Sequence, residues 1–507
     1  MTESLGLLML GFQGALTTQN LIAAAIGCFL GTLIGILPGI GPATTVALLI
    51  PVAFGLKPDS ALIMMTGVYM GAMYGGSLTA ILLKVPGEAS SVMTSIDGYE
   101  MAKQGRGAQA LAVSAIGSFV GGTASVIALT VMALPIAQFA LLLGPTEYFS
   151  LIVAAMIFVS VLLGKDLLRG IVGIVFGLAV STIGTDFQTG VPRLTFGLEA
   201  LTDGIDNVVV IIGIFGIGEV FWFLIREKMK VGERLAIKGR LWLSGDDWRR
   251  SWPAMARAAI IGFVCGLKPG SGATLGSILS YTLEQRLSKQ PERFGKGAIE
   301  AVAAPETANN AATGGAMISM LAIGIPGHAT TAVMLVALMM YGIMPGPRLM
   351  IDHPDLVWSV IASLYVSNVI LLVMNMPLIP LFVKILDIPT QFLMPLILVI
   401  AATGAFSMAN NLSDVVMAFV FGIVGYLMRL VQIPLVSVAL GVVLGERMEQ
   451  TMRQALLLAR GDPSIFVTRP MSAAFLASAV LLIVWDTVSR ERRRRSGKAQ
   501  LVIEEAT

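Results

Sequence analysis

A polar cluster interrupts an apolar stretch of the chain in the segment "PETANNAATGG", residues 305–315. Its side chains include a carboxylate, two amides and a hydroxyl, at Glu306, Asn309, Asn310 and Thr313. Their spacings of three, four and seven residues place all four on one face of a helix. Such groups can bind a cation, a proton or the oxygens of an anion, and inside an apolar span they are usually functional. We expect this face to line a polar cavity.

Two shorter motifs, "PGEASS" (86–91) and "PGHATT" (326–331), combine a helix-breaking Pro-Gly pair with one ionisable residue and two hydroxyls. Glu88 and His328 hold the same place in the two motifs. Glu88 could serve as a cation ligand or proton carrier, or both side chains could lie at a wet helix entrance. The hydroxyls that follow are Ser90, Ser91, Thr330 and Thr331. At the start of a new helix they can cap it or bind anion oxygens.

Two further breaks read "LPGIGPATT" (37–45) and "KPGSGAT" (268–274). Proline removes an amide donor and glycine relaxes the backbone, so a helix stops there. Within a bilayer, an unwound backbone must line a cavity enclosed by protein. The candidate binding residues of these segments are Gly39, Gly41, Thr44, Thr45, Gly270, Ser271, Gly272 and Thr274, and the proline breaks of all four segments are Pro38, Pro86, Pro269 and Pro326. The hydroxyls could instead bond back to the preceding helical turn.

The breaks recur at fixed intervals along the chain. Two spaced glycines and a Pro-Gly-x-Gly run begin at residue 31 and again at residue 262, an offset of 231. Chance would produce this match with a probability on the order of 10⁻⁵. The "PGEASS" and "PGHATT" motifs are offset by 240, and the extra residues fall in the charged loop 284–296. We therefore predict two homologous halves. The glycines at 31, 35, 262 and 266 also have the spacing that permits close helix packing.

Composition places the chain in a membrane. Of its 507 residues, 56% are hydrophobic and 13% charged, and the mean hydropathy is +0.83, whereas soluble domains carry about a quarter charged residues. Apolar runs of spanning length occur at 20–37, 60–83, 108–132, 147–163, 167–185, 207–225, 299–325, 356–382, 412–428 and 471–488. A net charge of +3 does not suggest a nucleic-acid partner. The fold class is an all-α polytopic membrane protein.

Charge in the loops indicates how the two halves are oriented. The basic loop 226–250 and the basic tail should both be cytoplasmic, and equivalent loops of the two halves carry opposite bias. One segment, 446–462, should be external but is basic. We predict two inverted repeats whose broken helices meet near the midplane, a pattern typical of transporters. The expected order is 1–19 N-terminal amphipathic segment, 20–226 repeat 1, 227–253 basic cytoplasmic linker, 254–445 repeat 2, 446–470 connecting segment, 471–488 C-terminal transmembrane helix and 489–507 basic cytoplasmic tail.

Enzyme signatures do not compete with this interpretation. The sequence contains no Walker A motif, no HExxH and no GxSxG, and only two histidines. The chain is expected not to be an enzyme and to use no cofactor. A passive channel, an intramembrane enzyme and a scaffold are the rival classes; symmetric breaks favour alternating access over all three.

The motifs "GILPGIGPAT", "YGGSLTAILLKVPGEASS", "DGYEMAKQGRGAQAL", "PGSGAT", "PETANNAATGGAMI" and "IPGHATTAVML" resemble the large membrane subunit of the tripartite tricarboxylate transporters, over about residues 20–460. The resemblance implies a multi-pass protein of the bacterial inner membrane that imports di- or tricarboxylates such as citrate, coupled to Na⁺ or H⁺. It implies a small four-helix membrane subunit and a periplasmic substrate-binding protein as partners, with a homodimer of the complex as an open alternative. Relatives of similar architecture suggest elevator-type motion.

Two lysines depart from the pattern of that family. Lys84 and Lys268 lie at breaks where members of the family commonly have uncharged residues. Each could extend to water or pair with an anionic substrate, so they bear on the charge of the substrate.

Overall fold

The computed structural model describes residues 2–37, 41–163, 167–186, 188–226, 235, 241–270, 272–385 and 390–495. Within these ranges the regular structure is helical, apart from a short antiparallel ribbon formed by β1 (Gly184–Thr185) and β2 (Pro192–Arg193). Seven of the described helices are long and apolar enough to cross a bilayer. The prediction of an all-α polytopic membrane protein is confirmed.

The chain forms two compact units, and each combines segments from both ends of the sequence. Unit 1 comprises Met1–Leu141 and Ile205–Leu427, and unit 2 comprises Leu142–Gly204 and Met428–Thr507. The first stretch of unit 1 contains α1 (Thr2–Ala15), α2 (Thr18–Gly35), α3 (Pro42–Phe54), α4 (Pro58–Leu83), η1 (Ala89–Ser91), α5 (Val92–Met101), η2 (Ala102–Arg106) and α6 (Gly107–Leu141). Its second stretch contains α9 (Asn207–Ile211), η4 (Ile212–Ile217), α10 (Gly218–Arg226), α11 (Gly245–Gly266), α12 (Gly272–Leu287), η5 (Pro291–Arg293), α13 (Glu300–Ile318), η6 (Ser319–Ile323), α14 (Ala329–Met340), α15 (Leu349–Asp352), α16 (Pro354–Ile385), α17 (Thr390–Ala409) and α18 (Leu412–Leu430).

Local sequence signals set where these helices begin. Pro42 and Pro58 stand at the first helical positions of α3 and α4, where the missing N–H has no intrahelical partner to lose. Helix α11 begins inside the segment predicted as a linker, because Ser244 and Asp247 form a reciprocal capping box at its start.

The spaced glycines hold pairs of helices in close contact. A Cβ added to Gly35 of α2 would lie 2.4 Å from the carbonyl oxygen of Ala72 in α4. A Cβ added to Gly266 of α11 would lie 2.2 Å from the carbonyl oxygen of Ala312 in α13. The glycines one turn earlier in each helix make the same kind of contact. The GxxxG spacing therefore serves helix packing, and equivalent positions of the two halves make equivalent contacts.

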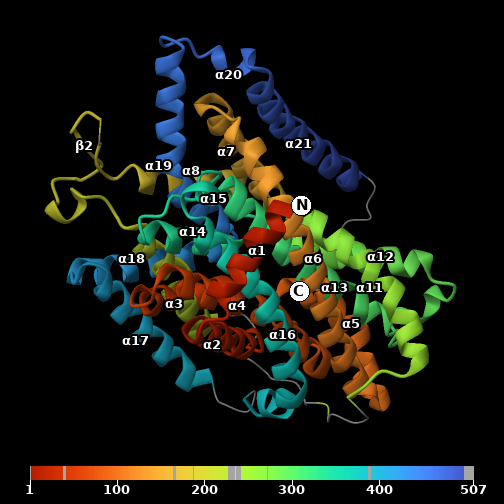
Figure 1. Cartoon of the computed structure of the whole chain (residues 1–507). Coiled ribbons are helices and arrows are strands. Elements are labelled where there is room, and N and C mark those ends of the chain that lie inside the picture. Colours follow the sequence, from red (N-terminus) through yellow and green to blue (C-terminus); the bar gives the residue numbers. More distant parts are fainter. Residues whose placement is uncertain are drawn as a thin grey trace. The chain divides into compact units, whose positions relative to one another are not determined.

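Contacts between the halves follow an exchange pattern within unit 1. Helix α3 packs against α14, whereas α12 packs against η1 and α5. The first breaks of the two halves are 37–45 and 268–274, and the second breaks are 86–91 and 326–331. In the predicted alignment, the helix after the first break of each half thus packs against the segment after the second break of the other half. The two repeats and their inverted orientation both stay predictions. Figure 1 shows α11, α12 and α13 side by side.

A buried carboxylate ties α5 to the loop before α13. Asp97 is fully buried, and its oxygens accept hydrogen bonds from the backbone N–H groups of Gly295, Gly297 and Ala298 at 2.9 Å. The hydroxyl of Tyr281 in α12 donates a further bond at 2.9 Å. Every donor here would lose its partner if the carboxylate were removed, so Asp97 fixes the position of α5.

Unit 2 contains α7 (Pro145–Leu163), α8 (Leu167–Ser181), η3 (Glu199–Leu201), α19 (Leu435–Leu458), α20 (Ile465–Thr468) and α21 (Pro470–Arg495). Arg453 of α19 bonds to Asp186 and to Glu449, both at 2.5 Å. The Arg453 guanidinium holds the pKa of the Asp186 carboxyl well below its usual range. Arg193 also bonds to Glu449, at 2.7 Å. Segments 186–206 and 446–462 therefore meet, as required if both face one side of the membrane, and the charge of Arg453 is offset there.

Substituting Gly266 tests the close packing of α11 on α13. In Gly266→Ala, the new Cβ would overlap the backbone of Ala312, and overpacking of this kind costs about 1–3 kcal/mol. We expect a lower unfolding temperature for the purified protein. The control is Gly6→Ala in α1, where an added Cβ meets no atom within 4 Å. Equal unfolding temperatures for the two variants would contradict this account.

Substituting Asp97 tests the contact between α5 and the loop before α13. Asp97→Ala leaves the buried N–H groups of Gly297 and Ala298, the N–H of the exposed Gly295 and the hydroxyl of Tyr281 without their acceptor. We therefore expect a loss of about 3 kcal/mol in the free energy of unfolding. Glu100→Ala on the same helix removes only a bond to Lys103, whose side chain is 48% exposed, and should be nearly neutral. Urea unfolding monitored by circular dichroism compares the two. An unchanged free energy of unfolding for Asp97→Ala would show that Asp97 does not fix the position of α5.

Candidate functional site

Glu88 and His328, the equivalent residues of the two halves, meet inside unit 1. Each stands at the residue before a new helix, Glu88 before η1 and His328 before α14, with extended backbone. Glu88 Oε1 lies 3.9 Å from His328 Nε2, and the two side chains are 12% and 15% exposed. The ring of Tyr69 in α4 stacks on the His328 ring at a centroid distance of 6.0 Å. The second breaks of the two halves thus converge at one buried point.

Glycines at the breaks let unwound segments bond to one another. The N–H of Gly270 donates to the carbonyl of Gly327 at 2.9 Å, which joins the first and second breaks of the second half. The N–H of Gly87 donates to the carbonyl of Gly76 at 3.3 Å, and a Cβ on Gly87 would lie 2.2 Å from the carbonyl oxygen of Gly35. The helix interruptions predicted at Pro86, Pro269 and Pro326 are present. Pro38, Gly39 and Ser271 lie outside the described residues.

Several predicted hydroxyls bond locally. Thr45 donates to the carbonyl of Gly41 at 3.2 Å and Thr313 to the carbonyl of Asn310 at 2.6 Å. Thr331 accepts from the N–H of His328 at 2.9 Å, which caps α14. Thr45 and Thr331 thus make the back-bonding and capping contacts that were the alternatives to ligand binding, and Thr313, predicted to line the cavity, also bonds back to its own helix.

Other hydroxyls are placed differently. Ser91 is fully buried, and its hydroxyl has no partner among the described residues. Ser90 contacts the Met73 sulfur at 3.8 Å, and its carbonyl accepts a bond from Ser277 of α12 at 2.7 Å. Thr330 lies 3.4 Å from His328 Nδ1. Thr44 is buried at the start of α3, Thr274 is half-buried in α12, and Gly272 begins that helix.

The polar face of α13 is helical and buried, but its residues contact different neighbours, and of the four only Asn310 lines the cavity described below. The Nδ2 group of Asn310 donates to Ser118 of α6 at 2.8 Å. Glu306 accepts a hydrogen bond from Thr94 of α5. Its other oxygen, and both amide atoms of Asn309, have no partner in the part of the chain that the structure describes. Unpartnered buried groups are costly, so this face is a candidate binding surface.

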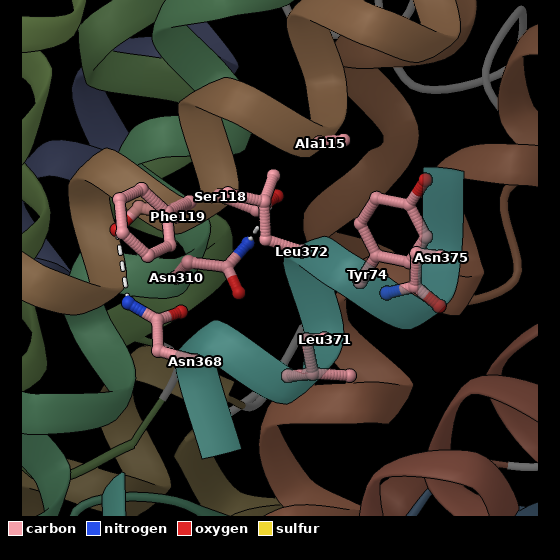
Figure 2. A pocket seen from close by; sticks show the side chains of 9 residues that line it. All are labelled: Tyr74, Ala115, Ser118, Phe119, Asn310, Asn368, Leu371, Leu372 and Asn375. Carbon is pink, nitrogen blue, oxygen red and sulfur yellow. Dashed lines mark hydrogen bonds between the residues drawn. The ribbon is translucent and has the colours of Figure 1, made fainter. Parts of the chain in front are cut away.

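A small cavity opens beside Asn310 (Figure 2), with space for about one water molecule. Its lining comes from α4, α6, α13 and α16: Tyr74, Ala115, Ser118, Phe119, Asn310, Asn368, Leu371, Leu372 and Asn375. Sequence reasoning missed four polar residues of this lining: Tyr74, Ser118, Asn368 and Asn375. The two asparagines are seven residues apart in an apolar run, and this spacing could have indicated one polar face.

The two lysines at the breaks reach outward. Lys84 has a left-handed backbone, with φ 59° and ψ 23°, at the end of α4. The equivalent residue of the second half is Gly324, with φ 80° and ψ 21°. The Lys84 ammonium lies 5.9 Å from the centre of the Tyr99 ring, and both Lys84 and Lys268 are exposed. Exposure alone does not distinguish extension to water from pairing with an anionic substrate, so both alternatives stay predictions.

The described ranges contain no group of three or more His, Cys, Asp and Glu side chains that could hold a metal ion. The fold and the site define a polytopic helical membrane protein whose interrupted helices surround buried polar groups. Membrane transporters are built in this way.

The chain belongs to the family described as "Tripartite tricarboxylate transporter TctA family", which it matches over residues 21–440. This confirms the resemblance seen in the motifs, and the chain is a multi-pass membrane subunit of a tripartite transporter that has other subunits. It is 43% identical over 496 residues to an uncharacterised 52.8 kDa protein in the TAR-I ttuC' 3' region of Agrobacterium vitis, covering 98% of each chain. A second Agrobacterium vitis protein, in the TAR-II ttuC' 3' region, is 41% identical over 234 residues, which are 46% of this chain and 97% of that protein. No solved structure matches.

Replacing Lys84 tests whether its backbone is strained. A left-handed conformation costs a residue with a Cβ about 1–2 kcal/mol, so Lys84→Gly should raise the free energy of unfolding by about 1 kcal/mol. Lys268→Gly is the matched control, because Lys268 is also exposed at a break but has no positive φ. Chemical unfolding measures the free energy of unfolding of both variants. A lower free energy of unfolding for Lys84→Gly than for the wild type would contradict strain at Lys84.

Proposed function

We propose that this subunit is a secondary transporter that imports a di- or tricarboxylate with a cation, and that the substrate binds where the breaks converge. The single observation that carries the proposal is the meeting of Glu88 and His328 at 3.9 Å. Each lies at the end of an interrupted helix, and the two come from equivalent positions of the sequence.

Helix N-termini favour an anion at this point. The turn η1, which leads into α5, begins beside Glu88, and α14 begins beside His328. The first N–H groups of a helix carry partial positive charge. The unpartnered hydroxyl of Ser91 adds one more donor. Lys84 and Lys268 are exposed at the edges of the breaks, where they would attract a carboxylate as it approaches.

The buried acids provide a reason for coupling. Glu88 and Glu306 each have one carboxyl oxygen without a partner in the described structure. An anionic substrate beside either group in its ionised form would be repelled in a medium of low polarity. A cotransported cation or proton offsets that repulsion, so substrate and cation would bind together more tightly than either alone.

Alternating access fits the way the halves exchange contacts. The four segments beside the site, α3, α12, η1 with α5, and α14, contact one another across the two halves, in addition to the contacts of α6 with α13 and of α16 with α4 and α6. A movement of the pair α3 and α14 against the pair formed by α12 and η1 with α5 would open the site from one side at a time. We propose that this movement is of the elevator type. The small four-helix subunit and a periplasmic binding protein that delivers the carboxylate are the proposed partners.

The test is uptake into proteoliposomes that contain this chain, its small membrane subunit and the loaded binding protein. A panel of radiolabelled di- and tricarboxylates is offered with and without an inward Na⁺ gradient, and separately with a proton gradient. We expect uptake of at least one acid against its own gradient. Uptake that only equilibrates would indicate a channel instead, and no flux of any acid in an intact complex would contradict the proposal.

Removing the Glu88 charge tests the coupling argument. Glu88→Gln preserves the shape of the side chain, so we expect flux to persist while accumulation falls. Each cation lost from coupling reduces the accumulation ratio about tenfold at a tenfold cation gradient. Glu100→Gln, on the partly exposed face of α5, is the control. Full accumulation by the Glu88→Gln transporter would exclude Glu88 from coupling.

A further inference from the structure

Asn309 of α13 holds the place in the second half that Tyr69 of α4 holds in the first. In the predicted alignment of the two halves, each lies 17 residues before the proline of the second break. Tyr69 stacks on His328, which belongs to the other half, at a centroid distance of 6.0 Å. The corresponding contact in the opposite sense brings Asn309 to Glu88, the counterpart of His328.

The register of α5 on α13 gives the same placement without the alignment. Thr94 of α5 donates to Glu306 of α13, whereas Asp97, further along α5, bonds to the loop before α13. The two helices therefore run antiparallel. Ser91 precedes Thr94 by three residues. Asn309 follows Glu306 by three residues, so Ser91 and Asn309 lie at the same level.

Met73 of α4 packs against both segments. Its sulfur lies 3.8 Å from the hydroxyl oxygen of Ser90 in η1, and it belongs to one buried apolar cluster with Ala312 of α13. Ala312 follows Asn309 by three residues, which is about one helical turn. Helix α13 also contacts η1 directly. Asn309 therefore lies where α13 passes η1, next to the position of Glu88 at the start of η1.

The polar atoms at this place are buried and unpartnered. Asn309 and Ser91 are both 0% exposed. Neither atom of the Asn309 amide, nor the hydroxyl of Ser91, has a hydrogen-bond partner among the described residues, and the same is true of Oε2 of Glu88. Buried polar groups are nearly always satisfied, so these atoms indicate hydrogen bonds that a ligand supplies.

The unpartnered atoms select a ligand group that both donates and accepts. The Nδ2 group of Asn309 donates, whereas its Oδ1 atom only accepts. A carboxylate offers acceptors alone, so it can bond to the Nδ2 group but leaves Oδ1 unsatisfied. A hydroxyl offers one donor and two acceptor sites. It can therefore donate to Asn309 Oδ1 and accept from Ser91 at the same time.

We propose that Asn309 is a specificity-determining residue that, together with Ser91, binds a hydroxyl group of the substrate, so that the substrate class is a hydroxycarboxylate. The inference rests on the proposed function and deepens it, because it assigns a substrate class to the site at Glu88 and His328. The two halves differ at this point: the first presents the ring of Tyr69 to His328, and the second presents an amide to Glu88. The hydroxyl of the substrate lies toward Glu88 and a carboxylate lies toward His328, at the start of α14.

The test measures binding to the membrane complex alone, so that the specificity of a binding protein does not enter. The complex of this chain with its small membrane subunit is unfolded by heat at increasing concentrations of malate or succinate, and of citrate or tricarballylate. The acids of each pair share a carbon skeleton and a number of carboxyl groups and differ by one hydroxyl. A ligand that binds the folded state raises the unfolding temperature. For at least one pair, we expect the hydroxy acid to reach half effect at a concentration at least about tenfold lower.

Substituting Asn309 should remove this difference. In Asn309→Leu, which is of similar size, the half-effect concentration of the preferred hydroxy acid should rise at least about tenfold, toward that of its matched acid. Ser91→Ala breaks no recorded hydrogen bond and should raise it several-fold, which provides a second measurement if Asn309→Leu fails to fold. The control is Gln13→Ala, which removes an exposed amide on α1 and should keep the wild-type difference.

Three results would overturn the inference. Equal half-effect concentrations within both pairs would show that no substrate hydroxyl is recognised, and concentrative uptake of a carboxylate would still leave the transporter proposal standing. An unchanged difference in both Asn309→Leu and Ser91→Ala would place hydroxyl recognition elsewhere. Absence of binding by all four acids to the folded complex would overturn the proposed substrate site and this inference with it.

Discussion

The structure of unit 1 depends on one constraint, which is that an unwound backbone inside a membrane protein must find its hydrogen-bond partners within the protein. Close approach makes this possible. Gly35 and Gly266 bring their helices into contact with the backbones of α4 and α13, and the carbonyls at these helix ends then lie against Gly87 and Gly327. Side chains larger than hydrogen at these glycines would separate the segments and leave N–H and C=O groups unsatisfied.

The same constraint creates the polar interior. Interrupting a helix exposes N–H groups at the start of the next one, and at two of these points the chain places Glu88 and His328. Glu306 on α13 adds a second buried carboxylate, and the amides of α13 and α16 line a cavity nearby. Groups so costly to bury, held on packed helices, are consistent with a site built for charged ligands.

Sequence reasoning predicted the class of fold and part of the candidate site, for identifiable reasons. Pro-Gly pairs break helices wherever they occur, so the interruptions at Pro86, Pro269 and Pro326 could be predicted from local chemistry alone. The motif around Asn310 could be recognised in the sequence because four polar residues stand close together in an apolar stretch. Asn368 and Asn375 are single polar residues in an apolar run, and Tyr74 resembles an ordinary aromatic core residue. Only the packing of α4, α6 and α16 around α13 brings them together.

Packing also gives different neighbours to polar residues that share one predicted face of α13. Residues three and four apart share a helix face, yet Asn310 contacts α6 while Glu306 contacts α5, because α13 is surrounded by neighbours. Likewise, the charge of Arg453, which lies in a segment expected to be external, is offset by ion pairs with Asp186 and Glu449.

The central claim is that the point where Glu88 and His328 meet is reached from each side of the membrane in turn. The most direct measurement is labelling of a single cysteine at Ser91 in a chain lacking Cys28 and Cys265, both of which are buried and free. Because the Ser91 hydroxyl has no partner among the described residues, Ser91→Cys breaks no recorded hydrogen bond. We predict that a membrane-impermeant thiol reagent labels it from either side of oriented vesicles and that the transported carboxylate protects it. Labelling from one side only, or labelling that no carboxylate prevents, would contradict the account.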